Sequence, residues 1–244
     1  MGIDRVASGN VIDPPTFIAL GHALYQLEND PGLKVGVLYG RGPNFCPGID
    51  VPAWSQVPPR ELFFPDATEF INPFSTVPPL RKKPLVVAVH GSTKYGGHEL
   101  FLASDIRVAA SDTVFSQGEA SRALFPAGGA TVRFVREAGW GNAMRYMLTG
   151  DEWSAEGSYR MGLLQAITPP GEQLKTAIEF AKKIAAAAPL GVRATLATAR
   201  RALEGEAAVY VTLLSEFGPL WRTQDFQERV RALRENRPPV YQGK

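Results

Sequence analysis

Apolar residues follow two different rhythms along this chain. In residues 16–28 they recur at helical spacing, and the Asp-Pro-Pro segment at 13–15 is typical of a helix start. Short continuous apolar runs at 34–39, 85–89 and 106–110 are instead typical of buried strands. Because these runs are separated by helical segments, the pattern predicts an α/β fold with a mainly parallel sheet covered on both faces.

The C-terminal part of the chain keeps only the helical rhythm. Helices are predicted at 174–187, at about 190–216 and at 224–235, with no strand pattern between them. We therefore divide the chain into an α/β core, residues 1–185, and a helical C-terminal subdomain, residues 186–244. Such an appended helical region often serves contacts between subunits.

Residues 51–80 have a different texture, with many prolines interleaved with large aromatic side chains. The aromatic residues are Trp54, Phe63, Phe64, Phe70 and Phe74. This composition predicts a mobile, partly helical flap with an apolar inner surface, which would suit a lid over an apolar substrate. An irregular but rigid surface loop explains the same composition.

Composition and charge exclude several classes of protein. The formal net charge is +2, and the basic residues are scattered, so no nucleic-acid partner is expected. No apolar stretch reaches the roughly 18 residues that cross a bilayer, and the first residues lack the features of a signal peptide. Cys46 is the single cysteine, which excludes an intramolecular disulfide and a multi-cysteine metal cluster. We therefore expect a soluble, cytoplasmic protein without a membrane partner.

Familiar catalytic and nucleotide-binding motifs are absent from the sequence. Gly40 and Gly42 follow a strand, but Phe45 stands where a dinucleotide-binding loop would have its third glycine. A Walker motif and the G-x-S-x-G elbow of serine hydrolases are also missing. The three histidines and one cysteine show no metal-ligand spacing, so no metal site is predicted.

Two loops remain that carry candidate chemistry. Residues 45–50 follow the first of the apolar strands, and residues 90–100 follow the second and open a short helix at 98–104. Paired glycines at Gly96 and Gly97 let backbone N–H groups approach a ligand, and a helix start favours negative charge. Two such N–H groups from separate loops form an oxyanion hole, which stabilises the enolate of a thioester. We therefore expect the centre of an enzyme active site at this turn.

A series of ordered motifs then identifies a resemblance that covers the chain from about Asn10 to the C-terminus. In chain order, the motifs are Phe45–Asp50, Lys83-Pro84, Val89–Gly91, Gly96–Leu100, Ser104–Arg107, Phe115–Glu119, Pro126–Gly129, Leu148–Gly150, Gly162-Leu163, Asp225–Glu228 and Arg237-Pro238. In order and spacing they resemble the enoyl-CoA hydratase/isomerase (crotonase) superfamily. The resemblance implies a spiral of ββα units and a C-terminal helical trimerisation region. The implied partners are an acyl-CoA thioester substrate and further copies of the chain, in a homotrimer or homohexamer.

The resemblance also implies roles for individual residues. The oxyanion donors of the family fall on the backbone N–H groups of Ile49 and Gly96, and its two catalytic glutamates fall on Glu99 and Glu119. The implied substrate-binding residues are Gly48, Asp50, Gly97, Ala127 and Gly128. In the family the first glutamate orients a water molecule and the second is usually the proton donor. No cofactor is implied, because coenzyme A is part of the substrate.

Two carboxylates facing one site suit the addition of water to a conjugated double bond. One group activates the water and the other delivers a proton to the α-carbon. Because like charges repel, one of the pair can hold its proton near neutral pH. The expected activity is that of a lyase, the reversible hydration of a 2-enoyl-CoA to a 3-hydroxyacyl-CoA through an oxyanion-stabilised thioester enolate.

Departures from the family pattern leave alternatives open. Tyr95 stands where the family usually has the first of three glycines, which narrows the approach to the oxyanion site. His98 stands at a position that is more often small or Cys. It would tune the neighbouring Glu99, replace it as a base, or simply pack behind the turn. The alternatives are a Δ3-Δ2 enoyl-CoA isomerase, an acyl-CoA or β-diketone hydrolase, and a catalytically weak acyl-CoA-binding subunit.

Overall fold

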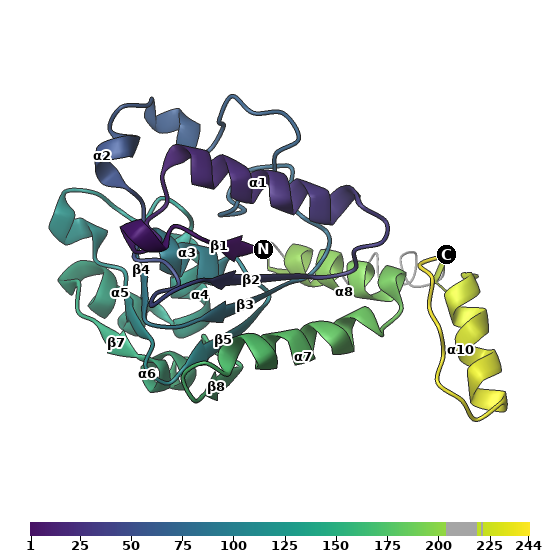
Figure 1. The fold of residues 1–244 in the computed structure, drawn as a ribbon. Helices are drawn as coiled ribbons and strands as arrows, with labels where there is room; N and C mark the ends of the chain where they lie inside the picture. The colour runs from purple at the N-terminus through teal and green to yellow at the C-terminus, as the bar shows by residue number, and fades with distance from the viewer. Residues whose placement is uncertain (204–218, 221) are drawn as a thin grey trace.

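The computed structural model describes residues 1–203, 219–220 and 222–244. A parallel sheet lies at its centre, as the apolar runs predict (Figure 1). Its five strands, in spatial order, are β1 (Gly2–Ile3), β2 (Gly36–Gly40), β3 (Leu85–Val89), β5 (Ile106–Ala110) and β8 (Ala166–Thr168). All four pairings are parallel. The predicted α/β fold with a mainly parallel sheet is therefore confirmed.

Helices cover both faces of this sheet, and the alternation of side chains along β3 shows why. Val86 and Ala88 pack with Ala177 and Ala181 of α7 (Gln173–Ala185) in one apolar cluster. Val87 and Val89 point the opposite way and belong to the larger cluster, to which α1 (Pro14–Asn29) contributes. Figure 1 shows α1 and α7 on opposite sides of β2 and β3. A strand buried on both faces reads as a continuous apolar run, which is the pattern seen in the sequence.

A smaller sheet carries the candidate site. It pairs β4 (Ser92–Lys94) in parallel with β6 (Val114–Ser116), and β6 in antiparallel with β7 (Trp153–Ser154). Isolated parallel bridges join Cys46 to Thr93 and Ile12 to Ile49. These pairings tie the loop at 45–50 to β4, which leads directly into the glycine turn.

The remaining helices agree with the sequence pattern where that pattern was periodic. The helix predicted at 98–104 is α3 (Gly96–Leu102), and the one predicted at 224–235 is α10 (Gln224–Arg234). The long helix predicted at about 190–216 begins as α8 (Pro189–Ala202), and most of its remainder lies outside the described residues. Among the described residues, three helices have no counterpart in the prediction: α4 (Ala130–Ala138), α5 (Trp140–Thr149) and α6 (Ala155–Arg160).

The proline-rich segment at 51–80 packs an apolar inner surface onto the core. It contains the short helix α2 (Val51–Trp54) and a 3₁₀ helix at 59–62. The Phe74 ring is buried, and it packs on the Phe17 ring of α1 with a centroid separation of 5.2 Å. The partly helical character and the apolar inner face agree with the sequence prediction, and its mobility stays a prediction.

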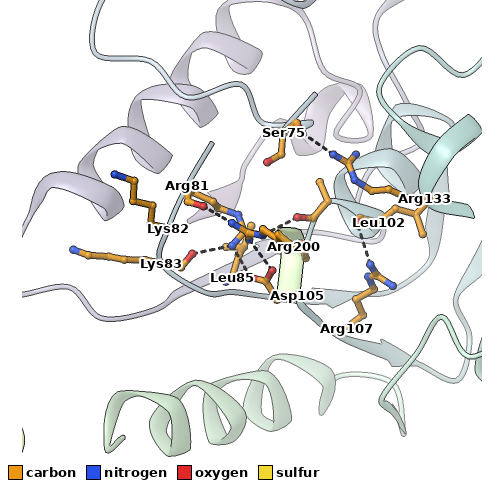
Figure 2. A network of polar contacts seen from close by, with 12 residues as sticks. Ser75, Arg81, Lys82, Lys83, Leu85, Leu102, Asp105, Arg107, Arg133 and Arg200 are labelled. Carbon is orange, nitrogen blue, oxygen red and sulfur yellow. Dashed lines mark hydrogen bonds and ion pairs between the residues drawn. The ribbon is translucent and has the colours of Figure 1, made fainter. Parts of the chain in front are cut away.

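A buried ion-pair network joins the C-terminal region to the core (Figure 2). Arg81 Nη1 lies 2.5 Å from Asp105 Oδ2, and Arg200 Nη2 of α8 lies 3.0 Å from Asp105 Oδ1. The helix α10, in contrast, projects away from the body of the molecule (Figure 1). The division at residue 185 stays a prediction. No described helix has the length and apolarity that a membrane span requires.

Candidate active site

The glycine turn and the loop at 45–50 make contact at Gly97, the second residue of α3. A Cβ atom added to Gly97 would lie 2.0 Å from the carbonyl oxygen of Cys46. Only glycine therefore permits this approach of helix and loop. Its neighbour Gly96 lies beside Ile49, since the Cβ position of Gly96 is 3.7 Å from the Ile49 nitrogen.

The two predicted oxyanion donors thus lie side by side. The bridge between Ile12 and Ile49 uses the Gly48 carbonyl and the Asp50 N–H, so the Ile49 N–H faces away from Ile12. Gly96 is the first residue of α3, and the first N–H groups of a helix have no partner within it. The dipole of the helix start adds positive potential at this point.

Tyr95 precedes the turn in an uncommon backbone conformation. Its φ is 53° and its ψ is −122°, a region that L residues with a side chain seldom occupy. Its ring lies against Gly48, and the Arg122 guanidinium lies 4.3 Å from the ring centroid. The tyrosine therefore places bulk beside the loop that carries Ile49.

Glu99 lies in the first turn of α3, with a side chain that is almost fully buried. Its Oε1 accepts a hydrogen bond of 3.2 Å from the N–H of Ala130, the first residue of α4. Gly128 packs directly on the other oxygen, because an added Cβ would lie 2.5 Å from Glu99 Oε2. Burial raises the pKa of Glu99 to about 8, and the charge of Glu119 contributes in the same direction.

Glu119 approaches the site from a 3₁₀ helix, Glu119–Arg122, that follows β6. Its Oε1 accepts a hydrogen bond of 2.8 Å from Gln117 Nε2. Its Oε2 is buried and has no hydrogen-bond partner among the described residues. Burial raises the pKa of Glu119, while the hydrogen bond from Gln117 and the charge of Arg122 oppose that rise. One oxygen of this carboxyl is therefore held and the other is free.

His98 packs behind the turn. Its ring is fully buried among Phe101, Phe115, Phe134 and Trp153, with centroid separations of 5.2 to 5.8 Å. Burial lowers the pKa of His98 to about 3, so the imidazole is neutral at physiological pH. This agrees with the packed interpretation of His98 and does not support a role as replacement base.

The residues implied as substrate contacts fall into two groups. The first group consists of three glycines in close contacts: Gly48 lies beside Tyr95, Gly97 beside Cys46, and Gly128 beside Glu99. Ala127 is partly buried next to Gly128. The Asp50 carboxylate accepts a hydrogen bond of 3.2 Å from Ala53 N and caps α2, so its side chain has a structural partner.

Three residues at the site carried no individual role in the sequence interpretation. Phe74 of the flap reaches the glycines, 3.6 Å from the Cβ position of Gly96. Arg133 donates a hydrogen bond of 2.7 Å to the Ser75 carbonyl of the flap (Figure 2). It donates a second, of 3.2 Å, to the Gly128 carbonyl, and so links the flap to the turn beside Glu99. Gln117 donates a hydrogen bond to Glu119. The position of both polar residues in one motif, two residues apart, was the sequence signal that could have indicated this contact.

Comparison with known proteins agrees with this geometry. The enoyl-CoA hydratase/isomerase family model matches residues 1–244. The chain is 32% identical over 247 aligned positions to enoyl-CoA hydratase EchA19 of Mycobacterium tuberculosis, covering 99% of this chain and 92% of that protein. It is 31% identical to (E)-benzylidenesuccinyl-CoA hydratase of Thauera aromatica, covering 99% and 94%.

Solved structures show the same likeness. A probable enoyl-CoA hydratase/isomerase from Mycobacterium abscessus superimposes with a TM-score of 0.95 at 40% identity, covering 100% of this chain and 94% of the other. An enoyl-CoA hydratase from Mycobacterium tuberculosis H37Rv superimposes with a TM-score of 0.90 at 32% identity, with the same coverage. The chain therefore belongs to the enoyl-CoA hydratase/isomerase family.

Proposed function

We propose that this protein catalyses the reversible hydration of a 2-enoyl-CoA to a 3-hydroxyacyl-CoA. The observation that carries the proposal is the pair of buried carboxyls, Glu99 and Glu119, beside two backbone donors from separate loops. Relatives named enoyl-CoA hydratase and crotonyl-CoA hydratase support it.

In the proposed mechanism the thioester carbonyl accepts hydrogen bonds from the N–H groups of Ile49 and Gly96. As water attacks the β-carbon, negative charge moves onto the thioester oxygen, where these donors and the start of α3 stabilise it. Because the donors belong to the backbone, their positions are set before the substrate arrives.

The two carboxyls divide the proton transfers. Glu99 takes a proton from the attacking water as the hydroxyl bonds to the β-carbon, and Glu119 gives a proton to the α-carbon as the enolate collapses. The pair begins and ends with one proton between them, because burial and mutual repulsion oppose the doubly ionised state. In the hydration direction this proton starts on Glu119, and the raised pKa of Glu99 favours the final state, in which Glu99 carries the proton taken from water. The proposed reaction moves only water and protons, so it requires neither a metal nor a redox cofactor.

The proposed acyl group is apolar. Phe74 lies against the Cβ positions of both Gly96 and Gly128, and its ring contacts Phe17, which in turn contacts Trp54 at 5.5 Å. An acyl group whose apolar chain or ring displaced Phe74 or stacked on it would have its α- and β-carbons beside Glu99. Substitution of Phe74 by a smaller residue would therefore shift the preference toward larger acyl groups.

A homotrimer or homohexamer is the proposed assembly. The projection of α10 away from the body leaves a helical arm that a second copy could contact (Figure 1). Leu233 on this helix and Val240 in the segment after it are 60% and 68% exposed. Sedimentation or light scattering of the intact chain tests this, and a purely monomeric species at micromolar concentration would contradict it.

Addition of crotonyl-CoA and longer homologues tests the proposed activity, since hydration removes the absorbance of the conjugated thioester. In a hydratase, Glu99→Gln and Glu119→Gln each lower kcat by roughly 10²- to 10⁴-fold, because both proton transfers are needed. Very unequal losses would favour the isomerase, which can rely on one carboxylate. Binding of acyl-CoA without turnover of any homologue would favour the weak acyl-CoA-binding subunit.

A further inference from the structure

A chain of three buried side chains leads from the aromatic cluster to one carboxyl oxygen of Glu119. His98 Nδ1 is hydrogen-bonded to Gln117 Oε1, and Gln117 Nε2 bonds to Glu119 Oε1 at 2.8 Å. His98 and Gln117 are fully buried, and Glu119 is 9% exposed. Breaking either hydrogen bond would leave a further polar atom unpaired in the interior.

The orientation of the Gln117 amide follows from a fourth group. Gln117 Nε2 also lies 3.4 Å from the carbonyl oxygen of Tyr95, which can only accept a hydrogen bond. The NH₂ end of the amide therefore faces Tyr95 and Glu119, and its oxygen faces His98. Since that oxygen is an acceptor, His98 must donate to it from Nδ1.

The protonation of His98 agrees with this direction. A neutral ring carries one proton, and burial keeps this ring neutral. With the proton on Nδ1, Nε2 has only a lone pair, and it has no hydrogen-bond partner among the described residues. The four aromatic rings around His98 prevent the ring from turning to exchange its two nitrogens.

We propose that His98 is a positioning residue for Glu119, which acts through the Gln117 amide to hold one carboxyl oxygen and leave the other free to exchange a proton with the substrate α-carbon. His98 itself neither touches the substrate nor transfers a proton. This inference rests on the proposed role of Glu119 in hydration.

Loss of the Nδ1 donor would release the amide. Gln117 could then turn its oxygen toward Glu119, where two acceptors would face each other. The hydrogen bond from Gln117 lowers the pKa of Glu119, so its loss raises that pKa and loosens the carboxyl. The thioester contacts, which belong to Ile49 and Gly96, would be unaffected.

A matched pair of variants separates positioning from packing. His98→Phe keeps a ring in the aromatic cluster and removes the donor. His98→Asn places an amide nitrogen near the position of Nδ1 but loses most of the ring. We expect His98→Phe to lower kcat for crotonyl-CoA about 10- to 100-fold with KM within about threefold. We expect His98→Asn to retain kcat within about threefold and to melt at the lower temperature of the two.

Activity and stability should therefore rank the two variants in opposite orders. The proposal would be overturned if the more stable variant were also the more active one, or if His98→Phe kept the wild-type kcat. The pH profile gives a further readout: the limb that Glu119→Gln removes should move to higher pH in His98→Phe. In a Gln117→Ala background, His98→Phe should cause no further loss of kcat.

Selective ¹⁵N labelling of histidine in the wild-type protein tests the tautomer without relying on the folding of any variant. The chain has three histidines, so the spectrum contains few signals. His98 should give the spectrum of a neutral ring with its proton on Nδ1, unchanged across neutral pH. A proton on Nε2 would refute the inference whatever the activity. Absence of turnover by the wild type, with the Nδ1 tautomer present, would refute the proposed function and leave the hydrogen-bonded chain as a structural finding.

Discussion

The two ends of helix α3 hold two carboxyls, one buried and one largely buried, whose pKa values are shifted in opposite directions. Glu99 lies in its first turn, where burial and then the charge of Glu119 raise its pKa to about 8 against the lowering effect of backbone N–H groups. Asp105, just after its last turn, lies between the guanidinium groups of Arg81 and Arg200. Burial alone would raise the pKa of Asp105, but these cations outweigh it and lower the pKa below its ordinary value.

The comparison shows that burial is not what separates a structural carboxylate from one that can exchange protons. Asp105 also accepts a hydrogen bond of 2.8 Å from the Leu85 N–H, so both its oxygens are occupied. Glu119, which interacts electrostatically with Glu99, keeps one oxygen without a hydrogen-bond partner in the described part of the chain. A carboxyl suited to proton transfer must be destabilised in its charged form and must keep one oxygen without a hydrogen-bond partner. Both conditions reduce the stability of the fold.

Removing the charge of Asp105 should have the largest effect on stability. Asp105→Asn leaves the buried Arg81 guanidinium without its carboxylate, which costs about 3 to 5 kcal/mol of the free energy of unfolding. Activity per folded molecule should change little, since Asp105 lies outside the site. Urea denaturation at fixed protein concentration measures the first quantity and the hydration assay the second.

Arg200 provides the control for this experiment, because its side chain is 33% exposed whereas that of Arg81 is 2% exposed. Arg200→Gln should therefore cost only about 1 kcal/mol. Equal losses in the two variants would mean that the buried partner is not the source of the effect.

The pH dependence of stability should differ in sign between the two carboxyls. The pKa of Glu99 is about 8 in the folded protein and has its ordinary value of 4.5 in the unfolded chain, so the folded protein binds this proton more tightly. The free energy of unfolding therefore falls as pH rises from about 5 to 8. This fall is on the order of a few kcal/mol. Asp105, with its lowered pKa, contributes stability above its ordinary pKa of 3.8 that is lost in acid.

Glu99→Gln should flatten the neutral part of this curve and leave the loss in acid in place. Asp105→Asn should do the reverse, with denaturant midpoints measured across the pH range. A curve for Glu99→Gln that matches the wild type between pH 5 and 8 would show that Glu99 is ionised in the folded protein throughout.

The smallest of these effects should come from geometry alone. Gly97→Ala puts a Cβ 2.0 Å from the Cys46 carbonyl and separates Ile49 from Gly96, so kcat should fall about 10- to 100-fold without any change of charge. Gly141 is the matched control: it is also the second residue of a helix, and nothing lies within 4 Å of its Cβ position. Wild-type kcat in Gly97→Ala would exclude the close approach as a requirement for activity.

Local pattern was a sound guide where an element buries one regular set of side chains. The strands β3 and β5 and the helices α1 and α7 were predicted within a few residues, because continuous or periodic apolar runs reflect burial directly. The helices α4, α5 and α6 were missed: each is only 6 to 10 residues long. Over so few turns the periodicity is weak, and packing determines the fold.

For the site, the chain alone determined which residue types were present and in which motifs they stood. The paired glycines were predicted from their chemistry, and the two glutamates from the family resemblance. Only the tertiary structure decided that Glu99 is buried against Gly128. It also brought Arg200, from far along the chain, into an ion pair with Asp105. Folding likewise linked His98 through Gln117 to Glu119. A pKa depends on burial and on charges brought near by folding, and neither can be read from positions along a chain.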